Sequence, residues 1–186
     1  AVALLSANEN TNIRNPEPLK NSLKSNDILP QKVVSLLHFG RSGTGLLHSL
    51  IDNHSEVSTL PSIYFSEFFD GSTWEKITAD GWTGMVDRFI ESYPVLFDAR
   101  ASNPVPSIAN RSIASLGVKE GMTTLGENRD EFLYVDKVLF RKKLICLMSR
   151  YDYVDPITFF KLVHVAYENT VNNYHNKGTS KEITRD

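Results

Sequence analysis

The spacing of hydrophobic and polar positions changes along the chain, and these changes predict a mixture of strands and helices. The apolar run 33–39 is typical of a strand that is buried on both faces of a sheet. The small-residue turn 40–45 follows it directly, and the amphipathic stretch 44–53 predicts a helix. A strand, a tight turn and a helix in this order indicate an α/β protein.

Beyond this helix the pattern predicts a strand at 56–60, helical turns at 62–70, and helices at 72–79 and 83–93. The hydroxyls of Ser72 and Thr83 are the expected N-caps of the two helices, and Pro94 ends the second. Glycine and proline then recur as far as residue 126, which predicts a loop with short helical pieces.

The last third of the chain is predicted to be mainly helical. One helix is expected over 129–142, and a second begins at Asp155-Pro156, where an acceptor at the cap precedes a proline at the first position. Apolar residues follow at spacings of three and four down to about residue 175 and form one buried stripe: Phe159, Leu162, Val163, Ala166 and Tyr167.

A third strand is expected at 144–148, where Cys146 would be a buried thiol. The predicted fold is therefore a three-layer α/β domain, with a parallel sheet, helices on both faces, and a ligand at the carboxyl end of the first strand. Residues 32–175 form this domain, between polar tails at 1–31 and 176–186. So few strands suggest the N-terminal part of a longer enzyme.

Composition narrows the possible partners. The chain has 186 residues, of which 41% are hydrophobic and 23% charged, as in ordinary globular proteins. A net charge of −2 provides no basic surface for nucleic acid. No apolar run is long enough for a membrane span, no convincing signal peptide is present, and the single cysteine is compatible with a reducing compartment, so a cytoplasmic location is expected.

The turn at 40–45 has the chemistry of an anion site. Gly40 and Gly45 have the spacing of a nucleotide-triphosphate loop, but Leu46 and Leu47 replace the lysine and the Ser/Thr that such a loop needs. The positive charge lies inside the turn, at Arg41, whose planar guanidinium suits a phosphate-like group. The turn therefore predicts anion binding without a metal ion.

The motif resembles a known family. Phe-Gly-Arg-Ser-Gly-Thr-Gly-Leu-Leu at 39–47, followed by Leu-Ile-Asp-Asn-His at 50–54, is similar to the 5′-phosphosulfate loop of sulfotransferases. Arginine before Ser-Gly-Thr is most similar to the tyrosylprotein and bacterial branches. The resemblance implies transfer of a sulfuryl group from 3′-phosphoadenosine-5′-phosphosulfate (PAPS) to an acceptor hydroxyl.

The resemblance also implies roles for individual residues. The expected cofactor-binding residues are Gly40, Arg41, Ser42, Gly43, Thr44, Gly45 and Leu46. Arg41 would also contact the sulfuryl group in transfer, and Glu67 would be the general base. Glu67 matches the family in region and not in position, so a solvated helix residue is the other interpretation. Ser42 and Thr44 can also act as helix caps.

Other residues receive structural interpretations. Leu46, Leu47 and Leu50 are expected to anchor their helix in the core. His54 matches the family's Leu-Asp-x-His pattern and is expected to make a structural hydrogen bond. No spacing among His38, His48, His54 and Cys146 suggests a metal site.

The site for the 3′-phosphate is the weakest part of the resemblance. Arg150 and Thr158 have the separation of the family's arginine and serine, but Asp-Pro does not follow Arg150. The alternative is that this site lies beyond Asp186. Two other function classes stay open: a non-catalytic module that binds a phosphate-bearing ligand, and a kinase-like protein with an altered loop. The acceptor can be a carbohydrate, lipid, peptide tyrosine or small alcohol, and the oligomeric state stays open.

Overall fold

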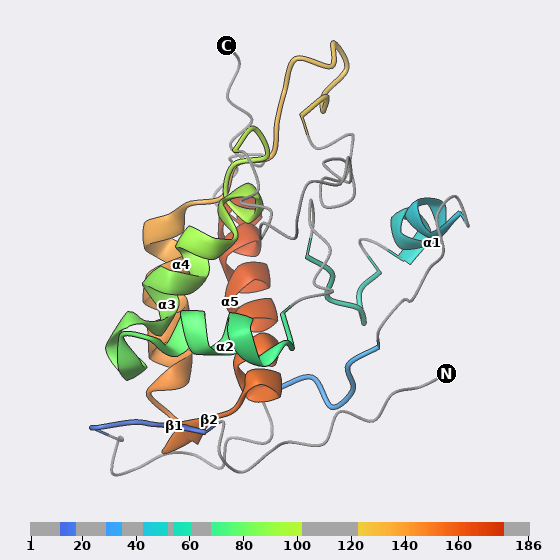
Figure 1. The fold of residues 1–186 in the computed structure, drawn as a ribbon. Coiled ribbons are helices and arrows are strands. Elements are labelled where there is room, and N and C mark those ends of the chain that lie inside the picture. The colour runs from blue at the N-terminus through green and yellow to red at the C-terminus, as the bar shows by residue number, and fades with distance from the viewer. Residues whose placement is uncertain are drawn as a thin grey trace, which may run out of the picture.

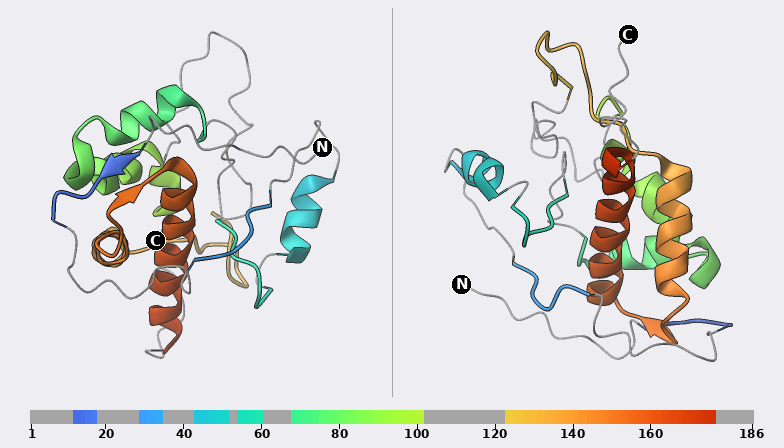
Figure 2. Two further views of the ribbon diagram at one scale, coloured as in Figure 1. Left: turned by 90° about the horizontal axis from the view of Figure 1, so that it is seen from below. Right: turned by 180° about the vertical axis from the view of Figure 1, so that it is seen from behind.

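The computed structural model describes residues 12–17, 29–34, 43–51, 54–60, 68–101 and 123–176. Four helices form its centre: α2 (Gly71–Thr78), α3 (Gly81–Ser92), α4 (Lys137–Met148) and α5 (Pro156–Asn176). Helices α3, α4 and α5 lie side by side, and α2 packs against α3 (Figure 1). Helix α1 (Thr44–Ile51) stands apart from this bundle in Figure 1 and in both views of Figure 2.

Aspartate side chains fix the starts of α4 and α5. The Asp136 carboxylate accepts hydrogen bonds from the N–H groups of Val138 at 2.8 Å and Leu139 at 3.1 Å. Asp155 accepts from the N–H of Thr158 at 2.6 Å, which confirms the predicted start of α5. The helix expected over 129–142 begins later than predicted, because the effective cap is Asp136.

Helices α2 and α3 confirm the two helices predicted in this region, but the predicted caps are wrong. Ser72 and Thr83 lie inside the helices, which begin one and two residues earlier. Asp70 and Asp80 occupy the two N-cap positions and make no side-chain capping bond. A 3-10 turn, Pro94–Leu96, follows α3, so this proline ends the helix as predicted.

Aromatic side chains fill the centre of the bundle. Among the described residues, five phenylalanines have no exposed surface: Phe68, Phe89, Phe97, Phe140 and Phe159. The Phe89 ring centroid lies 5.8 Å from that of Phe159 on α5 and 6.2 Å from that of Phe140 on α4. Burial of one such ring contributes about 1.5–3 kcal/mol. The predicted apolar stripe of α5 is confirmed, since all five of its residues are buried.

A short antiparallel ladder closes one end of the bundle. β1 (Ile13–Arg14) pairs with β2 (Tyr153–Val154), with Ile13 opposite Val154. Asn15 continues the contact: its N–H donates to the Asp152 carbonyl at 2.7 Å, and its buried side chain donates to the Tyr151 carbonyl at 3.0 Å. Part of the predicted N-terminal tail is therefore held against the bundle.

Two predicted strands are wrong. Residues 56–60 form no strand, and 144–148 are the last residues of α4. Leu144, Leu147 and Met148 are buried at helical spacing, whereas Cys146 is exposed, contrary to the expected buried thiol. Short apolar runs fit a strand or a buried helix equally well, and tertiary packing decides between them.

The first predicted strand is described only at its start. Val33 and Val34 are exposed and form no strand, and 35–39 lie outside the described residues. Among the described residues the paired strands are antiparallel, so the three-layer parallel sheet stays a prediction. Within the same ranges, no helix has the length and apolar character needed to cross a membrane.

Candidate functional site

The start of α1 is the part of the predicted loop that the structure describes. Gly43 precedes the helix with a φ of +75°, and its carbonyl accepts the N–H of Leu47 at 3.0 Å. Because this is the first turn, the N–H groups of Thr44, Gly45 and Leu46 have no helical carbonyl before them to bind. These donors and the positive end of the helix dipole suit an anion.

The backbone conformation explains why position 43 is a glycine. A φ of +75° lies in the left-handed region, where a side chain clashes with its own backbone. A Cβ at Gly43 would meet no atom within 4 Å, so space is not what excludes a larger residue. The glycine therefore allows the chain to turn directly into α1.

The leucines of α1 do not pack as expected. Leu46, Leu47 and Leu50 are 68%, 46% and 72% exposed, so their predicted role as core anchors is wrong. Periodicity shows that a helix has an apolar face, but it does not show which element covers that face. Among the described residues, the bundle packs around the phenylalanines of α3, α4 and α5 instead.

Several predicted site residues lie outside the described ranges: Gly40, Arg41, Ser42 and Glu67. The backbone of Thr44 and Gly45 is described as part of α1. The distances from Arg41 and Glu67 to the start of α1 therefore stay predictions.

His54 makes the structural hydrogen bond expected of it. Its Nδ1 accepts the N–H of Glu56 at 3.2 Å, and its own N–H donates to the carbonyl of Ile51 at 3.2 Å. These bonds stabilise the turn that follows α1. Within the described ranges, no three or more His, Cys, Asp or Glu side chains gather as a metal site would require.

Arg150 and Thr158 are not brought to the start of α1. Arg150 follows a helix and not a strand, and its N–H donates to the Leu147 carbonyl at 3.2 Å. Thr158 lies in the first turn of α5, as its position after Asp155-Pro156 suggested. Both flank β2, at an end of the bundle that stands away from α1 in Figures 1 and 2. This geometry gives no support to a shared nucleotide site.

A contact between Ser58 and His164 was not predicted. Ser58 Oγ lies 3.0 Å from His164 Nδ1, and the imidazole packs edge-on against Phe160, with ring centroids 4.7 Å apart. Burial lowers the pKa of His164 to about 4, against a smaller opposite effect of hydrogen bonding to the Ser58 backbone. The neutral imidazole thus joins the segment after α1 to α5. No short-range pattern links two residues so far apart in sequence.

Comparison of the chain with protein-family models, with curated proteins and with solved structures found no significant match. The likeness to sulfotransferases therefore rests on the residues at 39–54 themselves.

Proposed function

We propose that this chain is a sulfotransferase, or the N-terminal part of one, which transfers a sulfuryl group from PAPS to an acceptor hydroxyl without a metal ion. The main supporting observation is Gly43, whose left-handed φ of +75° lies directly before α1, inside the Arg-Ser-Gly-Thr-Gly motif. The sequence motif and the backbone conformation at Gly43 therefore both support the proposal that the start of α1 binds an anion.

The described residues fit the 5′-phosphate of such a cofactor. The N–H groups of Thr44, Gly45 and Leu46 are three donors at the positive end of a helix dipole. Arg41 and Ser42 directly precede them in the sequence and would complete the cradle. Leucines at 46 and 47 leave no lysine and no magnesium-binding hydroxyl, which favours a phosphosulfate over a nucleoside triphosphate.

The expected chemistry follows from the charge that develops during transfer. When bound, PAPS supplies the sulfuryl group and leaves as the 3′,5′-bisphosphate. The N–H groups at the start of α1 and the guanidinium of Arg41 would stabilise negative charge on the departing phosphate oxygen. Glu67 would accept the proton of the attacking hydroxyl, since a neutral alcohol is a weak nucleophile.

Calorimetric titration with 3′-phosphoadenosine 5′-phosphate in EDTA, next to ATP with magnesium, tests this proposal. We expect binding of the first ligand and little of the second. Arg41→Ala should lower the affinity at least about tenfold, the equivalent of 1.4 kcal/mol. Equal binding of both ligands, or unchanged affinity of Arg41→Ala, would contradict the proposal.

A second assay separates binding from transfer. If the chain binds 3′-phosphoadenosine 5′-phosphate but moves no labelled sulfate from PAPS to any of a panel of hydroxyl acceptors, the non-catalytic alternative gains support. In an active chain, Glu67→Gln should reduce turnover strongly and leave nucleotide affinity nearly unchanged, because a general base acts on the acceptor.

A further inference from the structure

The segment that follows α1 meets the bundle at His164 on α5. Ser58 Oγ lies 3.0 Å from His164 Nδ1, and the imidazole packs edge-on against Phe160. Ser58 is half-buried, residues 54–57 before it are exposed, and Leu60 is buried in the core. In Figure 1 and in the right-hand view of Figure 2, this segment lies between α1 and α5. The position of residues 54–58 against α5 therefore depends on the contact with His164.

The segment that precedes α1 reaches the same side of α5. Lys161 Nζ donates to the carbonyl of Gln31 at 3.4 Å, which is long for a hydrogen bond, and the contact is exposed. Lys161 and His164 are three residues apart, so they are neighbours on the helix surface. Of the two attachments, the half-buried contact of Ser58 with His164 is the shorter one, and it contains a group that titrates.

The protonation of His164 is linked to this contact. Burial lowers the pKa of His164 to about 4, against a smaller opposite effect of hydrogen bonding to the Ser58 backbone. An imidazole in water has a pKa of 6.5, so a proton binds more tightly once the segment has left. The cause is that a charged ring packed against Phe160 would lose its water.

Neighbouring charges do not account for this shift. The segments and helices that meet at His164 and Phe160 carry these charged or titratable side chains: Lys32, His54, Glu56, Asp70, Lys161 and Glu168. None of these six is among the causes of the lowered pKa of His164. Among the described residues, the penalty for protonation is therefore one of burial, and it disappears when water reaches the ring.

We propose that His164 is an acid-sensitive latch: when its imidazole is protonated, residues 54–58 leave α5, and α1 becomes free to move against the bundle. Leu60 stays in the core and marks the point where the released segment remains attached. With pKa values of about 4 in the contact and 6.5 in water, the equilibrium for docking falls roughly twentyfold between pH 7 and pH 5.

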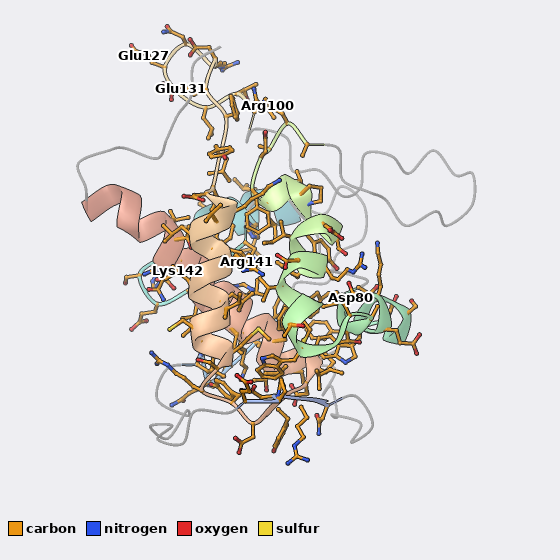
Figure 3. The ribbon with its side chains drawn as sticks, turned by 90° about the vertical axis from the view of Figure 1, so that its left-hand side faces the viewer. Asp80, Arg100, Glu127, Glu131, Arg141 and Lys142 are labelled. Atoms are coloured by element: carbon orange, nitrogen blue, oxygen red, sulfur yellow. The ribbon has the colours of Figure 1, made fainter. Side chains whose placement is uncertain are left out.

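The bundle should stay folded over the same range. Its centre consists of phenylalanines, which do not titrate. The side-chain hydrogen bond with Arg141 lowers the pKa of Asp87 below its ordinary value of 3.8, so the ion pair between α3 and α4 is still charged at pH 5. Figure 3 labels Arg141 on α4, on the side that faces α3. Acid should therefore release the segment before it unfolds the bundle.

Nuclear magnetic resonance of the whole chain, titrated from pH 7 to pH 4.5 without nucleotide, tests the latch. The imidazole signals report the protonation of His164. The heteronuclear Overhauser effect at the amides of Val57 and Ser58 reports the fast motion of the segment. The amides of Phe89 and Phe159 report whether the bundle stays folded.

We expect the segment of the natural chain to become mobile as His164 is protonated, with the bundle signals unchanged. His164→Gln should stay docked over the same range, because glutamine gains no proton. Ser58→Ala should release at a higher pH, since it loses the side-chain contact. His54→Asn is the matched control and should behave as the natural chain, because asparagine can also accept the N–H two residues on. Circular dichroism checks that each variant folds.

Three results would overturn the proposal. These are an unchanged segment while His164 is protonated, the same release in His164→Gln, or loss of the bundle signals together with those of the segment. The test uses no nucleotide, so failure of the latch and failure of the proposed function are separate outcomes.

Discussion

The helical bundle buries its large apolar side chains, whereas α1 leaves its leucines exposed to solvent. The bundle is held by interlocked phenylalanines and by aspartate caps on α4 and α5. In α1 three leucines are exposed, and the segment that follows the helix contacts α5 through the hydrogen bond between Ser58 and His164. Stability and the proposed binding chemistry therefore reside in separate parts of the chain, so variants should affect one without the other.

The largest expected effect is on the stability of the bundle. Phe89→Ala removes a ring that touches residues of both α4 and α5, and it should lower the free energy of unfolding by about 3–5 kcal/mol. Leu50→Ala, at an exposed position of α1, should change it by less than about 0.5 kcal/mol. Urea denaturation followed by circular dichroism measures both. Similar losses from the two variants would mean that α1 belongs to the core.

The contact between the two regions should depend on pH. The pKa of His164 is lowered to about 4 in the folded chain from its ordinary value of 6.5, so the unfolded chain binds the proton more tightly. His164 therefore makes stability fall as the pH drops from 6.5 toward 4, by at most about 1.4 kcal/mol per pH unit. Above pH 6.5 this dependence disappears, because the imidazole is neutral in both states.

His164→Gln should flatten this part of the profile in urea titrations at successive pH values. An unchanged slope in the variant would show that other groups cause the loss at low pH, and that the imidazole is not buried as described.

At the start of α1, the expected effect is on binding and not on folding. Gly43→Ala forces a side chain into a left-handed φ of +75°, which costs about 1–2 kcal/mol, so the turn should rearrange and lose nucleotide affinity. Gly71→Ala is the matched control: this glycine also begins a helix, but its φ is ordinary and its Cβ would meet nothing within 4 Å. Calorimetry should show reduced affinity only for Gly43→Ala.

The smallest effect concerns helix caps inside the bundle. Asp136→Ala removes two hydrogen bonds to the first turn of α4 and should destabilise the chain by about 1 kcal/mol. Asp70→Ala, at the N-cap position of α2, breaks no side-chain capping bond and should cost only a few tenths of a kcal/mol. Thermal unfolding compares the two, and equal shifts would argue against the described role of Asp136.

The sequence predicted helices better than strands, for a physical reason. The Asp155-Pro156 start and the stripe from Phe159 to Tyr167 are local signals, and both were confirmed. The run 144–148 carries no local signal that separates a strand from a helix. In the structure it is helical, because its apolar side chains pack against α5 at helical spacing. The pairing of Ser58 with His164 depends on tertiary structure alone, so no sequence pattern could reveal it. In the region of the candidate site, the start of α1 at Thr44 matches the predicted helix; the binding role of Gly43 stays a prediction, and Arg41 and Glu67 lie outside the described residues.

The measurement closest to the central claim is the response of the backbone amides at the start of α1 to 3′-phosphoadenosine 5′-phosphate. In nuclear magnetic resonance spectra recorded in EDTA, the amide signals of Thr44, Gly45 and Leu46 should shift with saturable dependence on nucleotide, because their N–H groups would donate to the 5′-phosphate. Amides in the middle of α5 should not move. Unmoved signals at 44–46, or shifts confined to the bundle, would contradict the proposal that this helix start binds the phosphosulfate nucleotide.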